Sequence, residues 1–281
     1  MTAVVRPVLR YHGGKFRLGP WVLKHFPAHQ VYVEPFGGAA SVLMQKPRSH
    51  GEVYNDLDDD IVNVFRILRD PVQCAQLERA LQLTPCSRVE FYQAFLSCDD
   101  PIERARRTFI RAEMGFGSAG ATKMTTGFRI DTKRNYGTSM ALWAEIPAKL
   151  AAFCQRLQGV LIENRPALRV IADHDTPETL FYVDPPYVHG ARVFRKGGYY
   201  RHEMTDEQHI ELLQALRQVK GMVVLSGYRN PLYDEHLGDW AQSETDARIA
   251  AGRGTVLRRE VLWINAQASN ALAGVQMRLS A

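Results

Sequence analysis

Residues 31–43 read VYVEPFGGAASVL, and the next apolar stretch, residues 52–58, reads EVYNDLD. In the first stretch a short apolar run leads into two glycines, and small residues follow them. Gly37 and Gly38 can adopt positive φ angles and let a ligand approach the backbone closely. The pattern therefore predicts a strand, a glycine turn and a helix, followed by a second strand that ends at Asp56.

This order of elements is typical of nucleotide-binding α/β folds, in which an acidic residue after the second strand binds the hydroxyls of a ribose. Asp56 follows Gly38 by 18 residues, and the pattern expects about 20. The turn has no G-x-G-x-x-G sequence, so a dinucleotide is not indicated. A plain strand-to-helix turn is the alternative, but the position of Asp56 favours a ligand that contains adenosine.

Strands and helices alternate along much of the remaining chain. Short runs rich in β-branched and aromatic residues predict strands at 31–33, 52–54, 160–162, 180–183, 222–225 and 261–264. Apolar residues recur at helical spacing between several of these runs, for example from Ile61 to Leu68. Thr205 and Gln208 form a capping box at the start of another predicted helix. This alternation predicts an α/β fold, a wound sheet with helices on its faces.

The alternation stops between residues 72 and 158. Helical patterns continue in this stretch, at 88–98, 101–113 and 142–156, but no run there resembles a buried strand. A segment rich in glycine and threonine, residues 115–137, interrupts the helical patterns. We therefore predict a mostly helical inserted domain with an irregular loop or hairpin. The predicted limits are 72–158 for the insert, and 1–71 with 159–281 for the α/β domain.

A candidate site follows the predicted strand in LFYVDPPYVHG, residues 180–190. The two prolines end this strand, because neither can donate a hydrogen bond to a sheet. Ligands bind beyond the carboxyl ends of strands in open α/β sheets, where Asp184 is expected to lie. The rigid turn lets the Asp184 carboxylate and the Pro185 carbonyl face one amino group, and Tyr187 offers a flat surface to a planar ring. A proline turn with a surface aspartate is the alternative.

Another candidate site precedes the first strand, in RYHGGKFRL, residues 10–18. The backbone N–H groups at Gly13 and Gly14, together with the Lys15 ammonium, can hold a carboxylate or a phosphate. A flexible turn with a solvated lysine is the alternative, and it is favoured when this segment is considered alone.

The charge of the chain favours an anionic partner. Its 281 residues carry a net charge of +5, and basic residues gather in segments 104–134, 192–202 and 246–259, outside the predicted strands. Basic loops with aromatic residues and glycines suit phosphates and unstacked bases, although each segment alone is more often a solvated surface. Together with a site for an amino group, they favour nucleic acid. The predicted contacts are Arg111, Lys123, Arg129, Arg134, Arg195, Lys196, Arg201 and Arg253.

The remaining composition argues against several classes of protein. None of the four cysteines lies in a C-x-x-C pair or near a histidine cluster, so we expect reduced thiols and no metal site. The N-terminal residues have no apolar core for a signal peptide, and no stretch approaches the ~20 apolar residues that span a membrane. We therefore expect a cytoplasmic protein.

In content and order, these motifs resemble those of the Dam-like, D12 class DNA adenine-N6 methyltransferases. YHGGK (11–15) is similar to the family's N-terminal cofactor motif, EPFGGA (34–39) to its glycine motif, and DPPY (184–187) to its catalytic motif. Asp56 matches the acid that binds ribose. LSGY (225–228) and REVLWIN (259–265) match the later strands. The resemblance implies a Rossmann-like methyltransferase sheet with a mostly helical inserted target-recognition domain.

The resemblance also implies a reaction. S-adenosylmethionine would be the methyl donor, double-stranded DNA the partner, and the N6 amino group of a flipped adenine the acceptor. The cofactor site would comprise Tyr11, Gly14, Lys15, Glu34, Pro35, Phe36, Gly37, Gly38, Asp56 and Asp184. Asp184 and Pro185 would accept hydrogen bonds from the amine, and Tyr187 would stack on the base. The protein would act in bacterial cytoplasm, either associated with the nucleoid or encoded by a phage.

Two departures from the family pattern concern recognition. Arg165 and Pro166 lie where many relatives have an acidic residue that bonds the cofactor's adenine amino group. The segment 115–137 lacks the Asn/Pro-rich hairpin of members that read GATC, so no target sequence is assigned.

Two other functions are alternatives. Related tetrapeptides serve enzymes that methylate an amine in RNA or a glutamine amide in a protein. A non-catalytic DNA-binding relative would keep the fold without the activity. The basic insert and the motif order favour DNA, and the complete DPPY and EPFGG sequences favour an active enzyme.

Overall fold

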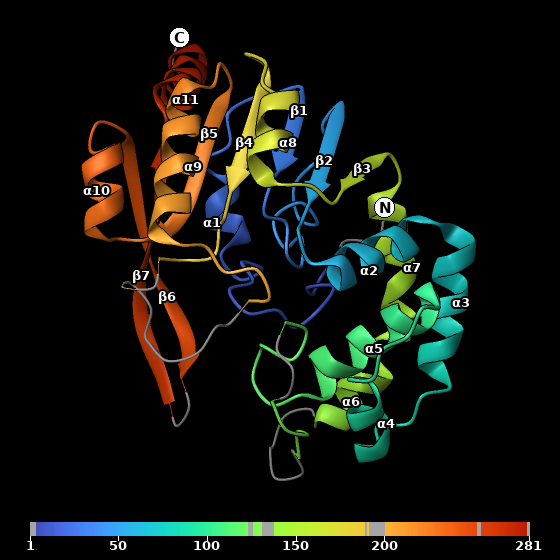
Figure 1. Ribbon diagram of the computed structural model, residues 1–281. Coiled ribbons are helices and arrows are strands. Elements are labelled where there is room, and N and C mark those ends of the chain that lie inside the picture. The colour runs from blue at the N-terminus through green and yellow to red at the C-terminus, as the bar shows by residue number, and fades with distance from the viewer. Residues whose placement is uncertain are drawn as a thin grey trace.

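A seven-stranded sheet with the order β3-β2-β1-β4-β5-β7-β6 forms the centre of the computed structural model (Figure 1). The model describes residues 4–122, 126–130, 138–188, 190, 200–251 and 254–279. The strands are β1 (Val31–Glu34), β2 (Gly51–Asn55), β3 (Val160–Glu163), β4 (Thr179–Val183), β5 (Met222–Tyr228), β6 (Ala241–Ala251) and β7 (Gly254–Ile264). Strands β1 to β5 are parallel, whereas β7 runs antiparallel to both β5 and β6. The predicted α/β fold is confirmed.

Apolar cores lie on both faces of the sheet, as expected for parallel strands with continuous apolar runs. Alternate residues of β1 enter different cores, Tyr32 on one face and Val33 on the other. The core with Val33 is covered by α8 (Ala167–Asp173), α9 (Asp206–Gln218) and α10 (Pro231–Leu237). The core with Tyr32 is covered by α1 (Gly19–Leu23), α2 (Asp59–Arg69), α7 (Leu150–Leu157) and α11 (Ala266–Leu279). Figure 1 shows α8 and α9 in front of the sheet.

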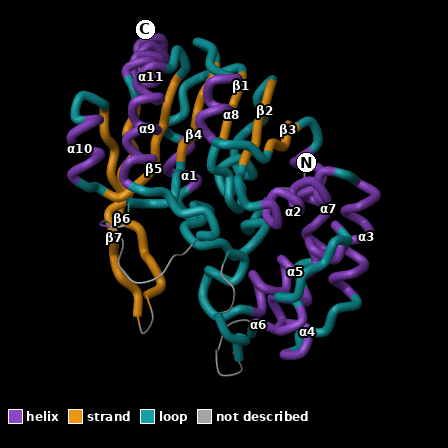
Figure 2. Tube along the Cα trace, in the orientation of Figure 1, coloured by secondary structure: helices purple, strands orange, loops and turns teal. Residues whose placement is uncertain are grey.

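The described chain between β2 and β3 contains helices and loops but no strand, apart from an isolated bridge between Gly115 and Phe128. Besides α2 and α7, it forms α3 (Pro71–Gln82), α4 (Arg88–Gln93), α5 (Pro101–Met114), α6 (Ser139–Ala144) and the 3₁₀ helix η1 (Pro147–Lys149). Figure 2 shows these helices gathered beyond the β3 end of the sheet. Helix α2 contacts both α5 and α7. The limits of an inserted domain, 72–158, stay a prediction.

Two predicted helices of this segment are shorter than expected. Helix α4 ends at Gln93, whereas the pattern extended to residue 98. The helix predicted at 142–156 is broken, because Pro147 starts η1 between α6 and α7. Proline has no N–H to continue a helical ladder, which explains the break.

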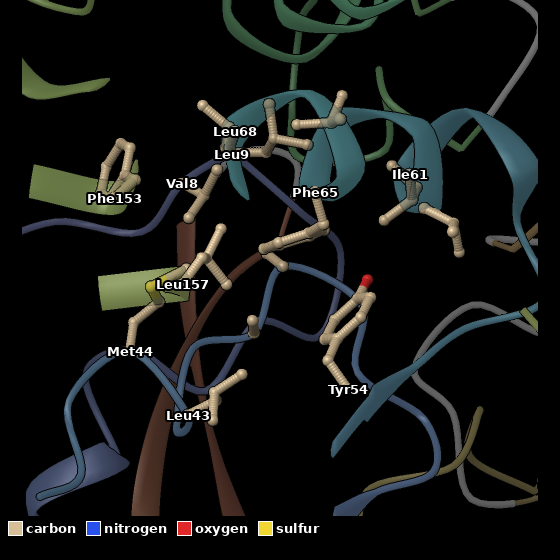
Figure 3. Close-up of a cluster of buried hydrophobic side chains, with 14 of the residues drawn as sticks. Val8, Leu9, Leu43, Met44, Tyr54, Ile61, Phe65, Leu68, Phe153 and Leu157 are labelled. Carbon is tan, nitrogen blue, oxygen red and sulfur yellow. The ribbon is translucent and has the colours of Figure 1, made fainter. Parts of the chain in front are cut away.

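The helix predicted directly after Gly38 does not form, and residues 38–46 make turns. Gly38 and Ala40 have φ angles of 47° and 50°, which a right-handed helix cannot contain. The turn is nevertheless firmly held, because the Tyr54 hydroxyl donates to the Gly38 carbonyl at 2.7 Å. Figure 3 shows Tyr54 beside Phe65 in a buried cluster, and their ring centroids are 4.3 Å apart. The core thus positions the glycine turn.

Strands β6 and β7 form a long hairpin that the sequence patterns did not predict. Pairing runs from Ala241 opposite Ile264 to Ala251 opposite Gly254. The strand predicted at 261–264 is only the end of β7, and the basic segment 246–259 lies within the hairpin. Only residues 260–264 of β7 pair with β5. Among the described residues, the outer part of the hairpin has no neighbouring strand beyond its own two, so its sequence does not need the continuous apolar run of a central strand. Figure 1 shows this outer part extending beyond the sheet.

Candidate active site

The carboxyl ends of β1 and β4 are neighbours at the centre of the sheet, since Val33 pairs with Phe181. The chain continues from β1 to β2 on one side, and from β4 to β5 on the other. The strand order therefore reverses between β1 and β4, and open α/β sheets bind ligands at such a point. A pocket lies there, and its lining includes Glu34 at the end of β1 and Asp184 just after β4.

This pocket brings together every residue that the sequence proposed for cofactor binding. Its lining includes Tyr11, Gly14, Lys15, Glu34, Pro35, Phe36, Gly37, Gly38, Asp56 and Asp184. Four separate parts of the chain supply them: the N-terminal segment, the turn after β1, the end of β2 and the end of β4. The lining also contains residues that were not predicted, among them His12, Ser41, Asp58, Ala167, Tyr182, Tyr200 and Met204.

The glycine turn leaves no room for side chains. A Cβ atom on Gly37 would lie 2.2 Å from the Tyr54 ring. A Cβ atom on Gly38 would lie 2.8 Å from the Tyr11 ring, and its positive φ angle would strain any other residue. The turn therefore requires glycine at both positions, and both glycines line the pocket.

Asp56 joins the ends of β1 and β2. Its carboxylate accepts a hydrogen bond from the Gly38 N–H at 2.8 Å and another from the Asp58 N–H at 2.8 Å. Burial raises the pKa of Asp56 to about 6, although the two N–H donors oppose this rise. The group is therefore ionised above pH 6, and it can accept further hydrogen bonds from hydroxyl groups.

Asp184 forms an ion pair with Lys15. The Lys15 ammonium lies 2.9 Å from Oδ1 and 3.0 Å from Oδ2, and it also donates to the Gly13 carbonyl at 2.9 Å. Burial alone would lower the pKa of Lys15, but Asp184 and Glu260 raise it above its usual value. Burial also raises the pKa of Asp184 to about 6, against the effect of Lys15. The sequence suggested that Lys15 holds a ligand anion, whereas here its ammonium holds the candidate catalytic carboxylate.

Tyr187 is fixed on three sides beside the pocket. Its hydroxyl donates a short hydrogen bond to Glu260 Oε1. Its ring meets Tyr228 edge to face, with centroids 4.5 Å apart, and the Lys15 ammonium lies 4.7 Å from its ring centroid. Burial raises the pKa of Tyr187 far above its usual value, so the hydroxyl stays a donor. Pro185 is buried directly after β4, between the two candidate catalytic side chains.

Sequence reasoning missed Glu260. It lies in β7 and is only 2% exposed, and it also accepts a hydrogen bond from the Ser226 hydroxyl at 2.9 Å. The available signal was an acidic residue at the start of the apolar run EVLWI, where a buried strand would favour an apolar side chain.

The structure contradicts the predicted DNA contact of Arg111. This residue is only 8% exposed, and its guanidinium binds Asp60 at 2.8 Å and the Ala94 carbonyl at 3.0 Å. Its charge therefore stabilises the packing of α5 on α2. A cluster of basic residues in a sequence does not reveal which of them have buried acidic partners.

The other predicted DNA contacts have varied positions. Arg201 lines the pocket, and its guanidinium binds Asp58 at 2.8 Å and Asp60 at 3.1 Å. Arg129 is partly buried. Five residues lie outside the described part of the chain, namely Lys123, Arg134, Arg195, Lys196 and Arg253.

The described residues contain no group of three or more His, Cys, Asp or Glu side chains arranged to hold a metal ion. Within the same residues, no helix has the length and apolar character needed to cross a membrane.

Comparisons with known proteins agree with the geometry of the site. The model of the D12 class N6 adenine-specific DNA methyltransferases matches residues 11–247. A DNA adenine methylase of Salmonella typhi is 23% identical over 241 residues, which cover 82% of this chain and 83% of the relative. The relative from Escherichia coli K12 is 25% identical over 215 residues, or 74% of each chain. One from Vibrio cholerae is 24% identical over 270 residues, which cover 89% of this chain and 93% of the relative.

Solved structures give weaker similarities. A precorrin-8w decarboxylase of Methanobacterium thermoautotrophicum is 11% identical, with a TM-score of 0.36 and 89% of each chain covered. A SAM-dependent methyltransferase of Agrobacterium tumefaciens is 12% identical, with a TM-score of 0.37 over 89% of this chain and 62% of that chain. These scores are too low to add to the description of the fold.

Proposed function

Because the chain belongs to the D12 class N6 adenine-specific DNA methyltransferases, we propose that it transfers a methyl group from S-adenosylmethionine to N6 of an adenine flipped out of double-stranded DNA. The observation that carries this proposal is the position of Asp184. Its carboxylate follows β4 at the switch point of the sheet, lines the pocket and is held by Lys15. A carboxylate fixed beside a cofactor pocket can orient an amine for attack.

The pocket fits S-adenosylmethionine, which carries a sulfonium and an ammonium cation. Acidic residues line it, among them Glu34, Asp56 and Asp58. Two of its buried polar atoms, Ser41 Oγ and Asp58 Oδ2, have no hydrogen-bond partner among the described residues. Polar atoms without partners are costly in a buried site unless a ligand satisfies them. Asp56 would hold the ribose hydroxyls.

The adenine end of the cofactor would be held without the acidic residue found in many relatives. Arg165 forms an ion pair with Asp173 at 2.7 Å, and Ala167, just after Pro166, lines the pocket. Phe36 and Leu57 also line it and supply further apolar surface. We therefore assign adenine binding to apolar contacts at Phe36, Leu57 and Ala167.

The chain's own residues would activate the target amine. An exocyclic adenine amine is a poor nucleophile because its lone pair is delocalised into the ring. Hydrogen bonds from its two N–H groups to the Asp184 carboxylate and the Pro185 carbonyl would favour a pyramidal nitrogen and free that lone pair. When bound, S-adenosylmethionine would supply the electrophilic methyl group, and its sulfur would leave with the electrons of the broken S–C bond.

Proton transfer would follow methyl transfer. A carboxylate with a pKa of about 6, as burial gives Asp184, is too weak a base to deprotonate a neutral amine. Once methylated, the nitrogen is cationic and readily loses a proton, which Asp184 would accept. Lys15 keeps the carboxylate directed at the reacting nitrogen. Positioning and charge stabilisation are the main contributions to catalysis.

Tyr187 would hold the flipped adenine. Extruding a base from duplex DNA costs a few kcal/mol, and stacking on an aromatic ring returns roughly 1–3 kcal/mol per base. The ring is partly buried next to Asp184, so a base stacked on it lies close to the carboxylate. Stacking therefore offsets much of the cost of flipping.

DNA would be bound on two sides of this site. We assign target recognition to the predicted insert, residues 72–158, and further phosphate contacts to Lys123, Arg134, Arg195, Lys196 and Arg253. We assign a phosphate contact to Arg129 as well. Both the insert helices and the β6–β7 hairpin extend past the carboxyl edge of the parallel strands (Figure 1). A duplex whose base enters the site would meet both elements, since the site lies at that edge.

Sequencing of modified bases tests the proposed function. The protein is expressed in bacteria that lack adenine methylation, and their DNA is sequenced for N6-methyladenine. We expect methylation at one short sequence, and none with the Asp184→Ala variant. Tritiated methyl transfer to duplex DNA, RNA and protein, measured in parallel, separates the enzymatic alternatives. Unmodified DNA in both cells and assays would overturn the proposal.

A further inference from the structure

We propose that Glu260 is a positioning residue that fixes Tyr187, the ring on which the target adenine stacks. This inference rests on the proposed function and extends it to β7, none of whose described side chains lines the cofactor pocket. Glu260 belongs to β7, lies opposite Tyr228 of β5, and is almost completely buried.

The Glu260 carboxylate is the centre of a network that joins three parts of the site. It accepts hydrogen bonds from the Tyr187 hydroxyl, in the turn after β4, and from the Ser226 hydroxyl of β5. Its Oε1 atom also lies 3.7 Å from the ammonium of Lys15, which itself binds Asp184. Through these contacts, β7 connects the stacking ring with the candidate catalytic carboxylate.

The contacts of Tyr187 restrain different motions of the ring. The hydroxyl lies on the long axis of the side chain, so its bond to Glu260 fixes the direction of that axis. Rotation of the ring about this axis is restrained by Tyr228, in an edge-to-face contact, and by Lys15 near the face of the ring. Stacking requires a defined ring plane, and all these contacts together provide one. Without Glu260, the ring axis could move to another rotamer.

The stability of the fold alone does not account for a carboxylate at this position. Buried ionic groups lose much hydration, and replacing them with well-packed apolar residues is often neutral or stabilising. The next residues of β7, Val261, Leu262 and Trp263, are fully buried and apolar. Unlike these apolar neighbours, the Glu260 carboxylate makes polar contacts, and it makes them with residues in and beside the site.

A double-mutant cycle tests this inference. Tyr187→Phe keeps the ring and removes the hydroxyl, while Glu260→Leu keeps most of the side-chain volume and removes both carboxylate oxygens. Each single variant should lower the single-turnover rate of DNA methylation at pH 8 about tenfold, as loss of a hydrogen bond to a charged group predicts. The double variant should also be only about tenfold slower than wild type, because both changes break the same contact. The affinity for S-adenosylmethionine should stay within about twofold of wild type.

A second measurement follows the flipped base directly. In duplex DNA with 2-aminopurine at the target position found by sequencing, flipping raises the fluorescence, and stacking on Tyr187 then quenches it. Both single variants should show less quenching than wild type. Tyr233→Phe is the matched control, because the Tyr233 hydroxyl is buried and bonded to His209 at 3.0 Å. It should lower the thermal stability without changing rate or quenching.

The outcomes distinguish this inference from the proposed function. Suppose that the wild-type protein methylates DNA. If the two single effects multiply to about a hundredfold in the double variant, Glu260 does not act through Tyr187. The same conclusion follows if either single variant methylates DNA as fast as wild type. If the wild-type protein does not methylate DNA, the proposed function fails, and the inference fails with it.

Discussion

The ammonium of Lys15 lies within 3.0 Å of both carboxylate oxygens of Asp184. This pairing holds the carboxylate in one orientation at the end of β4, and it supplies a buried positive charge beside it. Each effect has a separate consequence for activity. Fixed orientation favours hydrogen bonding to the target amine, and the charge sets the pH at which Asp184 is ionised.

The pH dependence of the methylation rate should report the ionisation of Asp184. Burial raises the pKa of Asp184 to about 6, and the charge of Lys15 lowers it from a still higher value. The rate should therefore fall as the pH drops through about 6. In Lys15→Gln the pKa of Asp184 rises, so the midpoint should move to higher pH. Lys149→Gln is the control, since Lys149 pairs with Glu145 on the helical segment. A midpoint in Lys15→Gln at or below the wild-type value would contradict the expectation.

Asp184→Asn should nearly abolish methylation while the protein stays folded. The amide keeps the volume of the side chain, but it has no charge and its NH₂ group cannot accept a hydrogen bond from the target amine. We expect a loss on the order of 100-fold in the single-turnover rate, as for other preorganised polar groups. Circular dichroism and thermal unfolding check the fold. A rate within a few fold of wild type would remove Asp184 from the catalytic residues.

Gly38→Ala should weaken cofactor binding as well as stability. The positive φ angle costs a non-glycine residue about 1–2 kcal/mol, and the added Cβ atom would lie 2.8 Å from the Tyr11 ring. Gly159→Ala is the matched control, because Gly159 also has a positive φ angle but has no atom within 4 Å of an added Cβ atom. Both variants should lose stability in urea, but only Gly38→Ala should bind S-adenosylmethionine more weakly in calorimetry. Equal affinities would separate this turn from the cofactor.

Arg201→Ala should raise the dissociation constant for S-adenosylmethionine. The ion pairs of Arg201 with Asp58 and Asp60 hold one wall of the pocket. Because its side chain is partly exposed, we expect an effect of up to about fivefold, which corresponds to ~1 kcal/mol. Arg217→Ala removes a comparable exposed pair with Asp239 far from the pocket, and it should have no effect. Identical binding by both variants would show that Arg201 does not support the pocket.

The salt dependence of DNA binding should distinguish surface cations from buried ones. Arg195→Ala with Lys196→Ala should reduce the slope of log affinity against log salt by about 1.8, or about 0.9 for each phosphate contact. Arg111→Ala should instead lower the free energy of unfolding by about 2 kcal/mol, because Arg111 is a buried partner of Asp60. Fluorescence anisotropy at several salt concentrations measures the slopes. An unchanged slope in the double variant would place both residues outside the DNA interface.

Local patterns predicted the elements that surround the pocket. The apolar runs of β1, β2 and β4 end at Glu34, Asn55 and Val183, as expected from the residues that follow them. Helix α9 begins at the predicted capping box of Thr205 and Gln208. These features depend on neighbours in the sequence, so a sequence contains enough information to find them.

Long-range contacts escaped prediction for physical reasons. No local pattern shows that β7 runs antiparallel beside β5, so the meeting of Glu260 with Tyr187 could not be foreseen. Similarly, Arg111 appears in a basic segment, and only the packing of α5 on α2 reveals its partner Asp60. The helix predicted after Gly38 failed because the φ angle of Ala40 reflects its tertiary surroundings rather than its helix propensity.

The late position of β7 has a consequence for biosynthesis. All described residues that line the cofactor pocket precede Ile210 in the chain, whereas Glu260 is synthesised after them. A nascent or prematurely terminated chain can therefore complete the residues of the pocket before Tyr187 has its partner. Such a chain should methylate DNA more slowly than one in which β7 has taken its place beside β5.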